Sequence, residues 1–342
     1  VEVDAMAGLA PTQAALDRVI AAFAAAAVPP PAGISGGRKG IALHLVGING
    51  QGRIDEAYLP PRDYPKGFAD FREDKAVYFG TLAERTNPNW AHIKAAKGKV
   101  FRYCIFAKDE LDGSSGATPY TPGNDLMVTL GFWDPPGAYV EIQAGTFMHE
   151  LGHTLGLEHG GKDSSNFRPN YHSVMNYAWQ FPRMGTIPGK NPWRLRYSEE
   201  VLAPLNESAL DENTPIGSKF PGQKVLYKNG KGDIKYTRCD KPVDWDGDGE
   251  ILAAPGTVAV DVNYFGEEDE PSPGEYLTGY NDCENLVYNF RTTGYYISQN
   301  PPAKTAVGMD WDTYVFLNSL PPPPPDCFTI TGAVSVIGCP RG

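Results

Sequence analysis

The feature that most constrains this chain is a set of histidines at fixed spacing near its middle. His149 and His153 are four residues apart, so on a helix their side chains project from one face and can bind the same ion. Glu150 directly follows the first histidine, where its carboxylate can reach a water bound to that ion. The pattern therefore predicts an active-site helix that carries two metal ligands and a general base.

A third histidine, His159, can join the other two only if the helix ends before it. A continuous helix rises about 1.5 Å per residue and would carry His159 roughly 15 Å beyond His149. Gly156 can adopt the left-handed conformation that ends a helix and reverses the chain. Three histidines and one water would then form a tetrahedral zinc site with an open position. The competing interpretation is a helix whose histidines make only ordinary hydrogen bonds.

Residues 149–159 fit H-E-x-x-H-x-x-G-x-x-H and resemble the zinc motif of the metzincin metalloproteases. Residues 173–177, S-V-M-N-Y, are similar to the methionine turn of that clan. The resemblance implies that Met175 lies beneath the zinc and that Tyr177 binds zinc or stabilises the transition state. Plain core packing is the alternative for both. The residue after the third histidine often marks the metzincin subfamily, and here it is Gly160, not the usual Glu of astacins or Pro of serralysins. The wider chain resembles uncharacterised secreted bacterial metalloproteases.

This resemblance implies a secreted zinc endopeptidase that acts on proteins or peptides. Zinc would activate a water, Glu150 would take its proton and pass it to the leaving amine, and Tyr177 would assist at the oxyanion. In metzincins the substrate lies antiparallel to an edge strand above the active-site helix. Residues 126–131 are our candidate for that strand, with a core strand as the alternative.

An acidic loop predicts a second metal. Residues 244–250, D-W-D-G-D-G-E, fit the opening of an EF-hand-like calcium loop. The twelfth position of the loop is Pro255 where a bidentate Glu is expected, so Asp261 or Asn263 would have to complete the site. A solvated acidic turn is the alternative. The expected calcium ligands are Asp244, Asp246, Asp248, Glu250 and Asp261.

Composition excludes some partners and favours a compartment. The net charge is −11, from 30 basic and 41 acidic residues, which argues against nucleic-acid binding. No run of 18 apolar residues indicates a membrane span. The five cysteines form no C-x-x-C pair. An oxidising compartment would favour the bonds Cys239–Cys283 and Cys327–Cys339 and leave Cys104 as a buried thiol. We therefore expect an extracellular monomer in mature or trimmed form.

The expected fold class is α+β, with an α/β-like N-terminal lobe. Helical patterns cover residues 11–27 and 68–84, and apolar runs predict strands at 40–46, 100–107 and 126–130. A short helix is expected near 198–210. The metzincin resemblance adds a twisted mixed sheet and an irregular C-terminal lobe. We expect a catalytic subdomain at 1–160, a subdomain with the methionine turn and calcium loop at 161–320, and a Pro-rich spacer with a disulfide-closed tail at 321–342.

A second functional class remains open at this stage. The chain could be a non-catalytic, calcium-dependent binding or adhesion protein whose zinc only stabilises the fold. Glu150 argues against this alternative, because a structural zinc site needs no acid there and usually fills its fourth position with a protein ligand.

Overall fold

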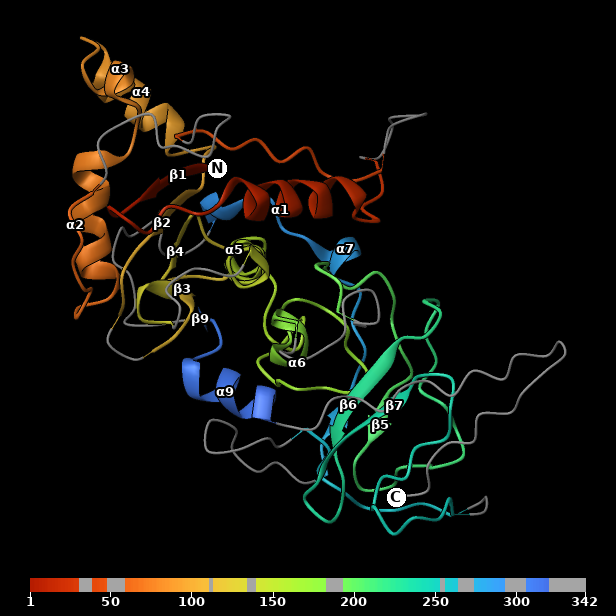
Figure 1. Cartoon of the computed structure of the whole chain (residues 1–342). Coiled ribbons are helices and arrows are strands. Elements are labelled where there is room, and N and C mark those ends of the chain that lie inside the picture. Colours follow the sequence, from red (N-terminus) through yellow and green to blue (C-terminus); the bar gives the residue numbers. More distant parts are fainter. Residues whose placement is uncertain are drawn as a thin grey trace, which may run out of the picture.

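The computed structural model describes residues 1–30, 39–47, 59–110, 113–133, 140–182, 193–252, 256–263, 274–292 and 306–319. The protein belongs to the α+β class, as expected. A five-stranded mixed sheet packs with helices in one part of the molecule, and short two-stranded sheets with long connections form another (Figure 1).

The five-stranded sheet has the order β1-β2-β4-β3-β9. Its strands are β1 (Glu2–Ala5), β2 (Tyr103–Phe106), β3 (Gly116–Thr118), β4 (Asp125–Val128) and β9 (Ala306–Val307). The first three strands in this order run parallel, β3 is antiparallel to β4, and β9 is antiparallel to β3. The sheet is therefore mixed, and its last strand comes from the far end of the described chain.

Both faces of this sheet are buried, because successive side chains of a strand point to opposite faces. Cys104, Phe106 and Leu126 pack in one cluster with residues of α1 (Gln13–Ala25) and α5 (Val140–Thr154). Ile105 and Met127 pack in a second cluster with residues of α2 (Phe68–Tyr78). Figure 1 accordingly shows α1 and α5 on one side of the strands and α2 on the other.

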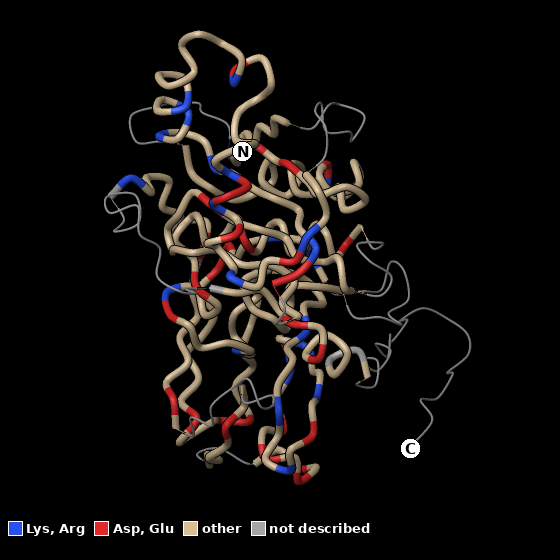
Figure 2. The backbone as a smooth tube through the Cα atoms, turned by 90° about the vertical axis from the view of Figure 1, so that its left-hand side faces the viewer, with Lys and Arg blue, Asp and Glu red and all other residues tan. Residues whose placement is uncertain are grey.

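The second part of the molecule has its own core. Its buried cluster draws only on residues 202–277, and it includes Trp245, whose ring lies 5.0 Å from that of Tyr227. Figure 2 shows Asp and Glu residues gathered at the lower end of the molecule, the end at which Figure 1 places the β6–β7 hairpin. The remaining elements are α3 (Leu82–Arg85), α4 (Trp90–Lys97), η1 (Leu130–Phe132), α6 (Tyr177–Gln180), β5 (Leu205–Asn206), β6 (Lys224–Lys228), β7 (Ile234–Arg238), β8 (Tyr276–Leu277), α7 (Asp282–Asn285), η2 (Phe290–Thr292) and α9 (Trp311–Ser319).

Several expected elements differ from the structure. Residues 40–46 form no strand and make only an isolated bridge between Glu2 and Val46. Residues 198–210 contain no helix; the two-residue strand β5 lies there instead. The predicted substrate strand was also wrong, because β4 is internal, between β2 and β3. Residues 306–319, expected in the second subdomain, return to the N-terminal sheet as β9 and α9.

Most of the other local predictions agree with the structure. The helical pattern at 11–27 corresponds to α1, and the pattern at 68–84 corresponds to α2 and the start of α3. Cys104 is a buried thiol, as expected. Cys239 and Cys283 are separate buried thiols in the structure and not the expected bonded pair, and the other expected pair, Cys327 and Cys339, lies outside the described residues. Among the described helices, none combines the length and the apolar character that a membrane crossing requires.

Candidate metal centre

Helix α5 carries the first two histidines into the interior of the protein. His149, Glu150 and His153 are fully buried on it. The Nε2 atoms of His149 and His153 lie 3.0 Å apart, and the ring centroids are 4.7 Å apart. The four-residue spacing therefore places the two imidazoles on one face of the helix, as predicted.

Helix α5 ends at Thr154, and Gly156 reverses the chain directly after it, as predicted. The glycine has φ +89°, which side-chain-bearing residues rarely adopt. The amide of Gly156 donates to the His153 carbonyl and the amide of Leu157 donates to the Gly152 carbonyl, each at 3.0 Å. These two bonds form a Schellman motif, which reverses the chain at a helix end. The reversal brings the His159 ring to 5.3 Å from His149 and 5.0 Å from His153.

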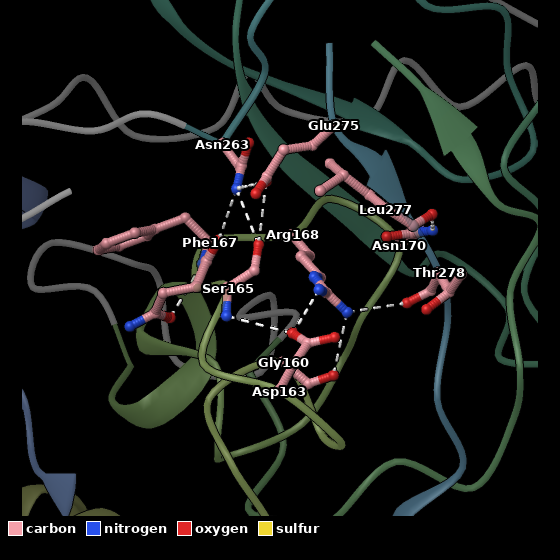
Figure 3. A network of polar contacts seen from close by, with 11 residues as sticks. Gly160, Asp163, Ser165, Phe167, Arg168, Asn170, Asn263, Glu275, Leu277 and Thr278 are labelled. Carbon is pink, nitrogen blue, oxygen red and sulfur yellow. Dashed lines mark hydrogen bonds and ion pairs between the residues drawn. The ribbon is translucent and has the colours of Figure 1, made fainter. Parts of the chain in front are cut away.

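The loop that holds His159 is tied down by its neighbours. Glu158 and Gly161 exchange two backbone hydrogen bonds of 2.9 Å, which close a tight turn around the histidine. Arg168 donates to the carbonyls of Gly160 and Thr278, each at 3.2 Å, and pairs with Asp163 (Figure 3). A Cβ on Gly160 would lie 2.6 Å from the Ser165 carbonyl oxygen, a backbone atom, so glycine is required there.

The hydrogen bonds of His149 and His153 favour their metal-binding form. His149 Nδ1 lies 2.9 Å from the Val174 carbonyl oxygen, and His153 Nδ1 lies 2.7 Å from that of Leu157. Because a carbonyl only accepts, each Nδ1 carries the proton, and each Nε2 presents a lone pair. Two facing lone pairs at 3.0 Å repel unless a cation lies against both. One nitrogen from each of the three histidines lies within 4.8 Å of the other two.

Burial also keeps these histidines neutral. Desolvation is the largest cause that lowers the pKa of His149 to about 3, and the electrostatic interaction with His159 lowers it further. Hydrogen bonds to the carbonyls of Val174 and Val307 raise this pKa but do not offset the other two causes. Desolvation lowers the pKa of His159 to about 4, and that of His153 falls well below its usual value. A neutral imidazole is the form that binds a metal, so this donor set fits a divalent transition metal.

Met175 packs against α5 beside the histidines. A Cβ on Gly152 would lie only 2.2 Å from Met175 Sδ, so the absence of a side chain at Gly152 makes room for the sulfur. The turn that presents Met175 is closed by a 3.1 Å bond from the Asn176 amide to the Ser173 carbonyl. Ser173 in turn donates to the buried carboxylate of Asp282 at 2.5 Å. The predicted turn thus forms directly beneath the helix.

Glu150 is held by a residue that the sequence did not reveal. Thr118 on β3 donates its hydroxyl to Glu150 Oε2 at 2.8 Å. The other oxygen, Oε1, is buried and has no hydrogen-bond partner among the described residues. Burial raises the pKa of Glu150 well above its usual value. The carboxyl group is therefore fixed in orientation and readily takes up a proton.

Tyr177 lies across the site from Glu150's helix, at the start of α6. Its ring centroid is 4.7 Å from that of His159. The Tyr177 hydroxyl donates to the Val307 carbonyl oxygen at 2.6 Å, and His159 Nε2 lies 3.0 Å from the same oxygen. Val307 belongs to β9, and no motif in the sequence pointed to it.

The acidic loop gathers a different set of residues from the one predicted. Oxygens of Asp244, Asp246 and Glu212 lie within 4.8 Å of one another. Glu212 is 1% exposed and accepts from the amides of Trp245 and Leu252, each at 2.8 Å. The other three predicted ligands, Asp248, Glu250 and Asp261, are not in this group, and Asp248 and Glu250 are exposed.

No protein-family model, curated protein or solved structure matches this chain.

Proposed function

We propose that this protein is a secreted zinc-dependent endopeptidase of the metzincin type. The observation that carries the proposal is the group of neutral imidazoles from the buried His149 and His153 and the partly buried His159, with two Nε2 atoms facing each other at 3.0 Å. These three residues would hold the zinc. When bound, zinc lowers the pKa of a water and polarises a carbonyl.

Two further residues have the chemistry that peptide hydrolysis needs. Glu150 would act as general base, supported by its raised pKa and by the Thr118 hydrogen bond that fixes its carboxyl group. Tyr177 would donate a hydrogen bond to the oxygen of the substrate carbonyl. The 2.6 Å hydrogen bond that its hydroxyl donates to the Val307 carbonyl oxygen supports this role.

The peptide would bind as an added strand. Since β4 is internal, the substrate would lie on the next strand, β3, which contacts Glu150 through Thr118. In the structure β9 pairs with that side of β3, so a substrate would take the place of β9. An extended peptide can pair with such an edge through main-chain hydrogen bonds. A calcium ion held by Glu212, Asp244 and Asp246 would stabilise the second part of the molecule.

The test compares two matched variants on α5. Glu150→Gln should keep the zinc content and the melting temperature of the wild type, yet lose about a hundredfold to ten-thousandfold in casein cleavage. Glu141→Gln makes the same change in the first turn of the helix, where the side chain is partly exposed and pairs with Arg18. This control should cleave casein normally, and a chelator should stop it.

One observation supports a second candidate, a non-catalytic binding protein with a structural zinc. The Val307 carbonyl already reaches His159 and Tyr177, so a protein group lies where an open position is needed. That alternative predicts tightly bound zinc and no cleavage of any peptide. Cleavage that survives in Glu150→Gln would instead refute the mechanism proposed above.

A further inference from the structure

The edge of β3 is paired with a segment from the end of the described chain. Register pairs Ala117 with Val307 in antiparallel orientation. The amide of Gly308 donates to the Gly116 carbonyl at 2.8 Å, and the Ser115 amide donates to the Met309 carbonyl at 2.9 Å. Residues 306–309 thus lie on this edge as an extended peptide would, through main-chain hydrogen bonds.

One peptide bond of this segment lies between the histidines and Glu150. The Val307 carbonyl oxygen accepts from Tyr177 and lies 3.0 Å from His159 Nε2. On the other side of the bond, a Cβ added to Gly308 would lie 2.9 Å from Glu150 Oε1 and 2.4 Å from Ser115 Oγ. Gly308 therefore fits against the general base only because it has no side chain.

The segment is anchored on its C-terminal side. Met309 is 1% exposed, and its amide donates to Gln180 at 3.1 Å. Helix α9 follows at once, and its Tyr314 ring lies 5.1 Å from Trp133 and 5.7 Å from Phe181. This packing holds the Val307–Gly308 bond in place beside the site.

We propose that the Val307–Gly308 bond is an internal substrate, which the site hydrolyses in its own chain. This inference rests on the proposed function. Hydrolysis breaks the bond between the Val307 carbonyl carbon and the Gly308 nitrogen. The oxygen of one water adds to that carbon to leave a carboxylate, and both protons of the water pass to the nitrogen, with Glu150 as the carrier.

The geometry also points to a class of external substrate. Until the bond is cut, residues 306–309 take the place that another peptide would need on β3. An external peptide that replaced them would favour glycine after the cleaved bond, because a Cβ there would have to displace the Ser115 hydroxyl and the Glu150 carboxyl group. A β-branched apolar residue such as Val307 is accepted before the bond.

The first test follows the intact mass of the full chain, purified without metal, after zinc is added. We expect two fragments, one ending at Val307 and one beginning at Gly308. The first-order rate constant of cleavage should stay the same over a tenfold dilution of the protein, because the reaction takes place within one chain. Gly308→Val should stay uncut, and Val315→Thr, an exposed change on α9, should be cut like the wild type.

A second test uses the metal-free protein and needs no activity. Hydrogen exchange should find the amides of Ser115 and Gly308 protected in the wild type and in Val315→Thr. Gly308→Val should lose protection at the Ser115 amide, since the valine displaces residues 306–309, which accept the hydrogen bond from that amide. Fast exchange at Ser115 in the wild type would overturn the proposal.

The outcomes separate this inference from the proposed function. Casein cleavage by a chain that itself stays intact would overturn the internal substrate and leave the endopeptidase standing. A rate that rises with protein concentration, or a break at another bond, would also overturn it. Loss of both casein cleavage and self-cleavage would remove the proposed function, and the internal substrate with it.

Discussion

The bend at the end of α5 can be tested with a single methyl group. Gly156 has φ +89°, and alanine in the left-handed region costs about 1–2 kcal/mol. Its new Cβ would lie 3.0 Å from Val287 Cγ2, a side-chain atom that can shift. Gly232, in the turn between β6 and β7, has φ +84° with nothing within 4 Å of an added Cβ. Gly232→Ala is therefore a control with matched backbone strain.

The two variants should differ in metal affinity. Gly232→Ala should lose about 1–2 kcal/mol in the free energy of unfolding of the metal-free protein, because its turn keeps the strained conformation with or without metal. Gly156→Ala should lose less, because its bend is free to relax while the histidines hold no metal. In Gly156→Ala the strained bend can relax, which moves His159 away from the other two histidines. Zinc binding must then restore the strain, and 1–2 kcal/mol corresponds to an affinity about 5–30-fold weaker. Gly232→Ala should bind zinc as the wild type does.

Urea denaturation of the metal-free proteins measures the first quantity, and competition with a chromophoric chelator measures the second. If Gly156→Ala kept both the metal-free stability and the zinc affinity of the wild type, the bend would not be what places His159. The reasoning would also fail if Gly232→Ala lost no stability, because a positive φ would then carry no strain.

Three further changes probe other parts of the structure. Thr118→Val removes the hydroxyl that holds Glu150, and kcat for casein should fall about 10–100-fold with zinc affinity unchanged. Burial raises the pKa of Asp282 to about 6, so the folded state takes up this proton at higher pH than the unfolded state. The contribution of Asp282 to the free energy of unfolding should therefore fall by up to about 3 kcal/mol as pH rises from about 4 to 6. Because the buried histidines contribute in the opposite direction, the quantity to measure is the difference in pH slope between the wild type and Asp282→Asn. Glu212→Gln should abolish the calcium-dependent rise in melting temperature expected of the wild type, whereas Glu250→Gln, at an exposed position, should retain it.

The metal group could be predicted from the sequence because its geometry is local. His149, His153 and His159 lie within eleven residues, and the helical repeat and one glycine decide how they meet. Thr118 and Val307 could not be predicted in this way. Thr118 is 32 residues from Glu150, and Val307 is 148 residues from His159. Their positions depend on strand register, which a three-residue and a two-residue strand do not encode as a pattern.

The errors in the strand predictions have a related cause. An apolar run indicates burial but does not identify the neighbours of a strand, so residues 126–130 suited an edge and a centre equally well. Residues 40–46 alternate between partly buried and exposed positions and bridge the sheet only at Val46. In the acidic loop, Glu212 comes from a segment more than thirty residues away and joins Asp244 and Asp246. Spacing within the loop alone could not identify it.

Strand β3 couples the general base to the peptide-binding edge. The Thr118 side chain fixes Glu150, and the backbone of residues 113–118 pairs with residues 306–311. Gly116 packs closely against Glu150 and against the neighbouring strand β4, since a Cβ there would be 2.9 Å from Glu150 Cγ and 2.6 Å from the Met127 carbonyl oxygen. A shift of this strand would therefore move the base and the bound peptide together, whereas the histidines, held by α5 and its reversal, would stay in place. The proposed metal binding and the proposed peptide hydrolysis would thus depend on different parts of the fold, and a variant of β3 should lose hydrolysis while it keeps the metal.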